Sequence, residues 1–441
     1  MRLAYKILAV FGLTVALLIS LTMIRGTVQD RQRYRAEAVE EVARSTAGPQ
    51  MLEGPVLFVP YSDRVVVMRA DTSGVQRPVE RVEAGTWAFF PKSLDIHGAM
   101  RSLPRMRGLY QVRVFELDTT LRATFHVRIP RDDDPATPRT IGEPRIGIGI
   151  RDVRGLVGVP SLRVSGTPSV LRQGLGYGSA GGLHTTLATP AEGGTLAFDV
   201  EFKSLLQGTE TLSIAPLAEH NMLALESSWP HPQFHGDFLP RTREIGKDGF
   251  RANWDVSSLA SNAQSLYRAG IDHPEEARTE AISVSLVDPV NVYSQVDRAT
   301  KYGVLFVLLT FVAFFMFEFL KQLRIHPVQY GLVGLAVAIF FLLLLALSER
   351  IPFGMAYVVA AMACIALTGY YLGHVLGGWA RGIGFAGMLG TLYAALYGLL
   401  VSEDNALVLG AGLLFLILAA IMVLTRKVDW YRAAASPPAQ F

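Results

Sequence analysis

The stretch that decides the fold class is residues 302–320, with the sequence YGVLFVLLTFVAFFMFEFL. It carries one acidic residue, Glu318, close to its C-terminal end, and no basic residue. A helix needs about 20 apolar residues to cross a hydrocarbon core of roughly 30 Å. The stretch is therefore predicted to be a transmembrane helix.

Five further stretches have the same character, and none of the six carries a charge in its middle. They are residues 7–24, 330–347, 354–372, 383–401 and 406–424. A charged residue at a helix centre costs about 2.5–3.5 kcal/mol on insertion scales, so six spans are predicted. Arg2 and Lys6 make the first span resemble a signal peptide, but residues 23–26 offer no small-x-small cleavage site. We expect it to remain as an anchor.

The basic residues near the span ends predict the orientation. With a cytoplasmic N-terminus, the cytoplasmic side holds Arg2, Lys6, Lys321, Arg324, Arg381, Arg426, Lys427 and Arg432. The short loops on the other side, 348–353 and 402–405, contain Arg350 as their single basic residue, beside three acidic residues. This asymmetry follows the positive-inside rule, from which long segments are exempt. Both termini are predicted to be cytoplasmic in a bacterial inner membrane, with residues 25–301 in the periplasm.

Between the first two spans, the apolar residues recur with a period of two. In residues 121–129 the alternating apolar side chains are Leu121, Ala123, Phe125, Val127 and Ile129. The same alternation runs through residues 196–202, 250–255 and 282–286. Half-buried antiparallel strands have this pattern. We predict an α-helical membrane protein of about six transmembrane helices with a large β-rich, sandwich-like extracytoplasmic domain.

These patterns divide the chain into five parts. They are an N-terminal transmembrane anchor (1–24), a helical linker (25–48), a periplasmic β-rich domain (49–301), a five-helix transmembrane bundle (302–424) and a cytoplasmic tail (425–441). In the bundle, small residues recur every four positions at Gly382, Ala386, Gly390, Ala394 and Gly398. Small residues let helices approach closely in a membrane. The single cysteine, Cys364, belongs to a similar stripe and is interpreted as a packing residue.

Residues 229–240, WPHPQFHGDFLP, form the most distinctive stretch outside the spans. His231, His235 and Asp237 are residue types that bind metals, but a histidine pair at this spacing fits zinc when both lie on one helix face. The prolines beside His231 disfavour a helix. We therefore favour an extended loop that packs Trp229 and two phenylalanines onto the sheet, with a metal site as the alternative.

Two isolated residues are further candidates for binding. Arg107 lies in the stretch 105–110, which is expected to open a strand, and it is either an anion contact or an exposed strand-edge side chain. Glu318 is the single acid within a predicted span, and such carboxylates are often functional. Its place beside Lys321 and Arg324 favours charge pairing at the membrane surface.

Several functions lack support in the composition and motifs. The formal net charge of +3, without a basic patch, gives no reason to expect nucleic-acid binding. No Gly-x-Ser-x-Gly elbow, Walker loop or His-Glu-x-x-His motif occurs in the sequence. We predict no catalytic residue, no cofactor and no resident metal.

Seven short stretches resemble the CreD family of inner membrane proteins. They are GPVLFVPY (54–61), FFP (89–91), RGLY (107–110), WPHPQF (229–234), FLP (238–240), DPVNVY (288–293) and RATKY (298–302). The likeness runs from the first span to the last, with Thr300 as a departure where a small or apolar residue is expected. Membership implies a place in the Cre regulon and a role in envelope integrity and stress tolerance, including sensitivity to colicins and β-lactams. It assigns no catalytic residue.

The preferred hypothesis is a non-enzymatic envelope protein whose periplasmic domain is a binding module. Its expected partners are membrane lipids and periplasmic or inner-membrane envelope proteins. Two alternatives remain open. One is a metal-dependent envelope enzyme that uses residues 229–240. The other is a transporter of a lipid-like substrate, since the spans lack the ionisable midplane groups that polar substrates need.

Overall fold

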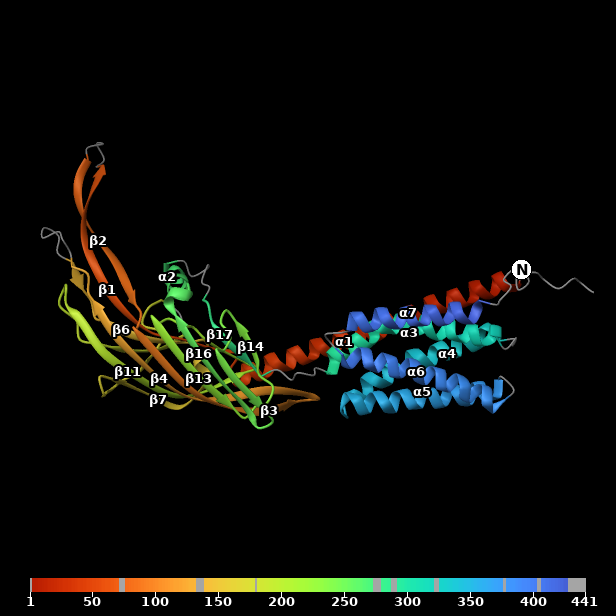
Figure 1. The fold of residues 1–441 in the computed structure, drawn as a ribbon. Coiled ribbons are helices and arrows are strands. Elements are labelled where there is room, and N and C mark those ends of the chain that lie inside the picture. The colour runs from red at the N-terminus through yellow and green to blue at the C-terminus, as the bar shows by residue number, and fades with distance from the viewer. Residues whose placement is uncertain are drawn as a thin grey trace, which may run out of the picture. The chain divides into compact units, whose positions relative to one another are not determined.

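The computed structural model describes residues 2–70, 76–131, 139–178, 181–272, 279–286, 292–320, 325–375, 378–402 and 406–426. These residues form two compact units. One consists of Met1–Arg35 and Val290–Phe441 and is helical, and the other consists of Ala36–Pro289 and is rich in strands (Figure 1). The first helix, α1 (Arg2–Ser45), belongs to both units because it continues without a break beyond Arg35.

The helical unit contains five more helices. They are α3 (Val292–Leu320), α4 (Pro327–Ser348), α5 (Phe353–Val375), α6 (Trp379–Val401) and α7 (Ala406–Thr425). Five described helices are long and apolar enough to cross a membrane, namely those at Phe11–Ser45, Val292–Met316, Pro327–Ser348, Phe353–Val375 and Trp379–Val401. The sixth predicted span corresponds to α7, whose apolar part within the described residues, Val408–Ala420, is shorter.

Pairs of small residues bring α5 and α6 into close contact at one end. A Cβ atom added to Gly382 would lie 2.6 Å from the Cα of Gly373, and one added to Gly369 would lie 2.9 Å from the Cβ of Ala386. At Gly398 such an atom would meet nothing within 4 Å. The predicted small-residue stripe therefore mediates close packing at its first two positions, while its far end does not.

The strand-rich unit contains two sheets. The nine-stranded sheet has the order β14 (Gln233–Gly236), β17 (Ile282–Ser285), β12 (Thr211–Ile214), β1 (Gln50–Ala70), β6 (Arg145–Ile150), β10 (Gly182–Thr186) and β9 (Arg172–Gln173), with β2 (Gln76–Phe89) and β5 (Thr140–Ile141) also paired to β1. The eight-stranded sheet has the order β15 (Thr242–Gly246), β16 (Gly249–Ser257), β13 (His220–Ser227), β3 (Ser93–Arg107), β4 (Tyr110–Arg128), β11 (Thr195–Thr209), β7 (Leu156–Val164) and β8 (Thr167–Ser169).

One hydrophobic core lies between the two sheets. Leu57 and Val59 of β1 pack in the same cluster as Phe125 of β4 and Trp254 of β16. The alternation read from residues 121–129 is confirmed, since all five apolar side chains are buried and the polar ones between them are exposed. The unit is therefore a two-layer β structure, with the outer face of the eight-stranded sheet polar.

Strand β17 departs from the predicted alternation. All four of its residues are buried, including Ser283 and Ser285. The strand lies inside its sheet, between β14 and β12, and its two hydroxyls bond to the hydroxyls of Ser213 and Thr211, each at 2.8 Å. Paired hydroxyls satisfy each other's hydrogen-bonding capacity, so these polar residues are tolerated where the pattern predicted exposure.

The outer face of the nine-stranded sheet is covered by a short helix, α2 (Ala263–Asp272). Its Tyr267 packs with Phe58 of β1 and meets Phe90 edge-on at 5.9 Å. Two single-turn 3-10 helices complete the described elements, η1 (Val153–Gly155) and η2 (Ser258–Ala260).

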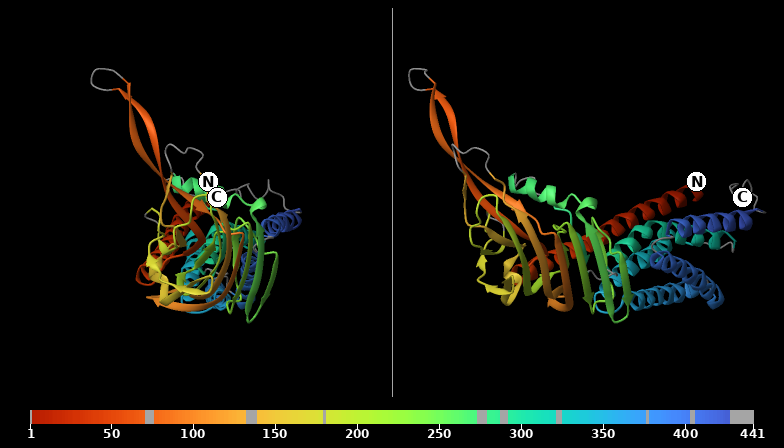
Figure 2. Two further views of the ribbon diagram at one scale, coloured as in Figure 1. Left: turned by 90° about the vertical axis from the view of Figure 1, so that its left-hand side faces the viewer. Right: turned by 60° about the vertical axis from the view of Figure 1, so that its left-hand side comes forward.

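Beyond the sheet, β1 and β2 continue as a two-stranded ribbon. The two strands pair without interruption from Leu57 opposite Phe89 to Ala70 opposite Gln76. In both views of Figure 2 the ribbon, drawn in orange, projects from the body of the strand-rich unit.

Candidate functional sites

Trp229 lies two residues beyond the end of β13 and is held by three contacts. The guanidinium of Arg113 lies 4.1 Å from the centre of its ring. Its indole N–H donates to the carbonyl of His231 at 2.9 Å, and its backbone N–H donates to the hydroxyl of Ser227 at 3.2 Å. The imidazole of His231 meets the indole edge-on at 5.7 Å, so these two predicted site residues do lie together.

The remainder of the segment crosses from one sheet to the other. Phe234 on β14 contacts the rings of Phe250 and Trp254 edge-on, at 5.5 and 5.6 Å. The indole N–H of Trp254 donates to the carbonyl of Phe238 at 3.1 Å. Trp229, Phe234 and Phe238 pack against the main core, as the sequence predicted.

His235 and Asp237 are engaged with the neighbouring chain. His235 Nε2 lies 2.7 Å from the hydroxyl of Ser285, and the carboxylate of Asp237 accepts the backbone N–H of Ala281 at 2.9 Å. Across the residues that the structure describes, no group of three or more His, Cys, Asp or Glu side chains is arranged to hold a metal. The predicted alternative ligands His231, His235 and Asp237 thus bind separate partners and do not form a ligand set.

Residues 105–110 are expected to open a strand, and β4 does begin at Tyr110, but Arg107 lies at the end of the preceding strand. Strand β3 ends at Arg107, Gly108 adopts a positive φ of 58°, and β4 begins at Tyr110. A positive φ suits glycine, and this explains why the chain turns here. Arg107 Nε donates to the carboxylate of Glu41 at 2.7 Å, and its Nη2 bonds to the other carboxylate oxygen, so the side chain attaches the hairpin to α1.

Glu318 is buried in the helical unit, with 9% of its surface exposed. Its carboxylate accepts the hydroxyl of Tyr330 at 2.7 Å and the backbone N–H of Ile325 at 3.4 Å. The bond to Tyr330 joins α3 to α4. Lys321 and Arg324, the expected charge partners, lie outside the described residues.

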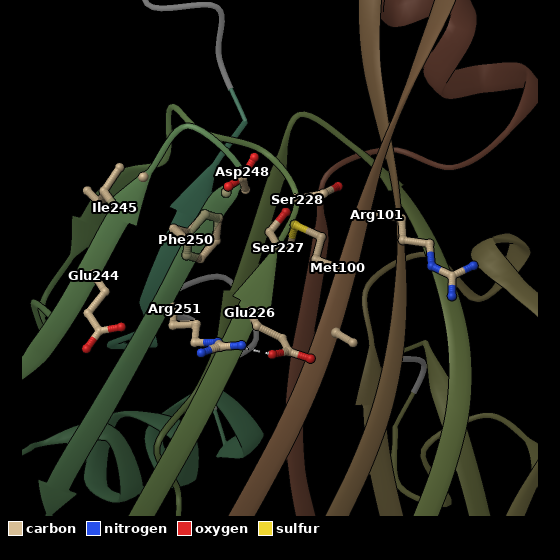
Figure 3. A pocket seen from close by; sticks show the side chains of 13 residues that line it. Met100, Arg101, Glu226, Ser227, Ser228, Glu244, Ile245, Asp248, Phe250 and Arg251 are labelled. Atoms are coloured by element: carbon tan, nitrogen blue, oxygen red, sulfur yellow. Dashed lines mark ion pairs between the residues drawn. The ribbon is translucent and has the colours of Figure 1, made fainter.

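The structure adds a site that the sequence did not predict. An open pocket of about 610 Å³ lies where β13 ends at Ser227 while β3 continues beyond it (Figure 3). Its wall is the β15–β16 hairpin, whose turn contains Asp248. The signal in the sequence was Asp248-Gly249 between two strand-like runs, a common hairpin turn.

The rim of this pocket carries charges of both signs. Arg251 lies 3.6 Å from Glu226, as the dashed line in Figure 3 marks. Arg101, Glu244 and Asp248 also line the pocket, and Met100 and Phe250 are buried beside them. Guanidinium and carboxylate groups on one rim suit a polar ligand that carries charge, such as a peptide or a zwitterionic headgroup.

Together, the two units define a multi-pass membrane protein that carries a two-sheet β domain. The chain from residue 2 to residue 431 matches the family described as Inner membrane protein CreD. The chain belongs to this family of inner membrane proteins.

A curated relative and a solved structure complete the comparison. The chain is 37% identical to Inner membrane protein CreD of Escherichia coli (strain K12) over 431 residues, which is 97% of this chain and 93% of the relative. An M1 zinc metallopeptidase of Deinococcus radiodurans aligns with 44% of this chain and 42% of its own, at 10% identity and a TM-score of 0.23. A likeness this weak supports no argument about fold or activity. The description of the CreD family names no enzymatic activity.

Proposed function

We propose that this protein is a non-enzymatic inner-membrane protein that supports envelope integrity under stress, and that its strand-rich unit is a periplasmic binding module. The observation that carries the binding role is the open pocket beside β13, with its rim of mixed charges. The envelope role rests on membership of the CreD family and on the resemblance described above.

Three ion pairs within the helical unit support the proposed orientation. Arg25 of α1 lies 3.3 Å from Asp297 of α3, which also meets Lys301 at 2.7 Å. Arg31 of α1 lies 3.2 Å from Glu349, in the loop after α4. The contacts group these segments at one end of the helices, as expected if all of them face the periplasm.

The test of the binding role is crosslinking in living cells. A photo-crosslinking amino acid at Glu244 or Asp248, on the pocket rim, is expected to capture a discrete envelope component. The matched control carries the same amino acid at Leu259, which is 97% exposed and lies outside the pocket lining. Equal capture from Leu259, or retention of the Glu244 adduct after Arg101→Glu, would show that the pocket does not bind the captured species.

A further inference from the structure

The ribbon formed by the distal parts of β1 and β2 has an unpaired edge. In the described part of the chain, β2 pairs with β1 and with no other strand. Residues 78–84 of β2 are all exposed to solvent. A free edge of this length is a template for another strand, and proteins usually cover or interrupt such edges.

The ribbon is held firmly at its base. Tyr61 and Trp87 stack with their ring centres 4.2 Å apart, and the guanidinium of Arg139 lies about 5 Å from both rings. Arg139 also donates to both carboxylate oxygens of Asp63, at 2.6 and 2.9 Å. Two-stranded ribbons are marginally stable in water, so these contacts preorganise an arm that adds little to the core.

Apolar side chains are exposed on both faces of this arm. Val66, Met68 and Val82 are 52%, 64% and 64% exposed and share one face, as the strand register requires. Val65 and Val79 lie on the other face. A ribbon that exposes apolar side chains on both faces and has a free edge is suited to become an inner part of a larger sheet, in which neighbours cover it.

We propose that β2 pairs in antiparallel orientation with β2 of a second copy of this chain, about a two-fold axis that passes midway between the two Val82 residues. In this register, a residue before Val82 in one copy lies opposite the residue at the same distance after Val82 in the other copy. Arg81 of each copy therefore faces Glu83 of the other. Opposite charges across a strand pair are stabilising, and like charges are destabilising. The edge is therefore complementary to itself, as a two-fold interface requires.

Neighbouring registers lack this complementarity. An axis at Arg81 would place two arginines face to face, and an axis at Glu83 would do the same with two glutamates. The Val82 register also sets Val79 opposite Gly85 of the second copy. A Cβ atom on Gly85 would lie 2.4 Å from the ring of Tyr61, so this glycine leaves room for the ring, and Val79 gains an aromatic neighbour.

The test uses disulfide formation in native membranes of cells that express the full chain. Paired residues in an antiparallel sheet have Cα atoms about 4.5–5.5 Å apart, within the range that a disulfide spans. Val82→Cys is therefore expected to form a disulfide-linked dimer on mild oxidation. Val79→Cys is the matched control, because two copies of residue 79 would lie about 20 Å apart along the strands. The native cysteine, Cys364, is buried.

Charge exchange tests the register. Arg81→Glu and Glu83→Arg, each combined with Val82→Cys, are expected to lower the dimer yield about threefold or more, because each places like charges opposite one another. The double exchange, Arg81→Glu with Glu83→Arg, is expected to restore it. The proposal is wrong if Val82→Cys gives no dimer or no more than Val79→Cys, if it joins a different protein, or if the double exchange fails to restore the yield.

Discussion

At the scale of single residues, Gly249 has the least room for a side chain among the glycines that the structure describes. Its φ is +134°, and a Cβ atom there would lie 1.9 Å from the carbonyl oxygen of Ser227. We expect Gly249→Ala to lower the free energy of unfolding by more than about 2 kcal/mol, through backbone strain and the clash together. Thermal unfolding of the purified full chain, followed by tryptophan fluorescence, measures the effect.

Gly246 is the matched control, since it lies on the other arm of the same hairpin. A Cβ atom there would meet nothing within 4 Å. Gly246→Ala should change stability by less than about 0.5 kcal/mol. Similar losses at both glycines would contradict the steric explanation.

The bond between Tyr330 and Glu318 makes a second prediction at this scale. Tyr330→Phe keeps the ring and removes the hydroxyl that donates to the buried carboxylate. A buried acceptor that loses one of its donors is destabilised, by up to about 1–3 kcal/mol, so we expect a lower melting temperature in detergent. Tyr370→Phe, on the exposed side of α5, is the control and should melt like the wild type. An unchanged melting temperature in Tyr330→Phe would show that the bond contributes little.

Glu53 predicts a dependence of stability on pH. Burial raises the pKa of this carboxyl above its usual value, and the nearby Arg151 opposes the shift. The folded state then holds its proton at pH values where the unfolded state has lost it, so stability falls as pH rises from about 4.3 through the raised pKa. Glu53→Gln removes this titration.

The measurement compares melting temperatures between pH 5 and pH 8. The advantage of Glu53→Gln over the wild type should grow as pH rises. Glu143→Gln, at an exposed position, should follow the wild-type curve throughout. A constant difference between Glu53→Gln and the wild type at every pH would exclude a role for ionisation.

At the scale of elements, the segment that follows α1, residues 47–50, makes several hydrogen bonds within the strand-rich unit. These bonds hold the end of α1 in place. The buried hydroxyl of Thr209, on β11, donates to the carbonyl of Ala47 at 2.6 Å, and its backbone N–H donates to the carbonyl of Gly48 at 3.1 Å. The side chain of Gln50 bonds to the carbonyls of Asp152 and Gln207. These bonds attach the segment that follows the helix to β11 and to the loop that contains Asp152.

Removal of one of these bonds should loosen the attachment of α1. Thr209→Val keeps the shape of the side chain and leaves the carbonyl of Ala47 without its donor, at a cost of about 1–3 kcal/mol. We expect faster hydrogen exchange in residues 42–50. Thr195→Val, at an exposed position of the same strand, should leave exchange there unchanged. Equal exchange in both variants would contradict the prediction.

Elements with a repeated local pattern could be predicted from the sequence, and those defined by distant contacts could not. The alternation in β4 and β16 is local, because each strand has one buried and one exposed face. Strand β17 gave the same pattern, yet its serines are buried because β14 and β12 lie on either side. The distal half of β1 could not be predicted as a strand. It lies away from the core, so its apolar and charged residues do not alternate.

The candidate sites show the same division. Packing of Trp229 and Phe234 onto the core followed from aromatic residues beside prolines. The pocket beside β13 could not be predicted, because its residues come from β3, β13 and the β15–β16 hairpin, which are brought together by a parallel pairing of β3 with β13. A parallel pair leaves no short-range signal in the sequence.

At the scale of the whole molecule, the orientation across the membrane is open to a direct test. Leu259→Cys, exposed on η2, should react with a membrane-impermeant maleimide in intact spheroplasts. Arg426→Cys, exposed after α7, should react only after the membrane is permeabilised. Labelling of Arg426→Cys in intact cells, or protection of Leu259→Cys, would reverse the proposed topology.

The sheet order also governs when the strand-rich unit can finish folding. Leu52 of β1 pairs with Ile214 of β12, and β12 pairs in turn with β17, which comes from the last residues of the unit. At synthesis rates of roughly 5–20 residues per second, β12 is synthesised on the order of ten seconds or more after β1. The adjacent β2 is available at once, so the ribbon is the first strand pair able to form. The nascent chain must then remain protected from aggregation until nearly all of the unit has left the ribosome.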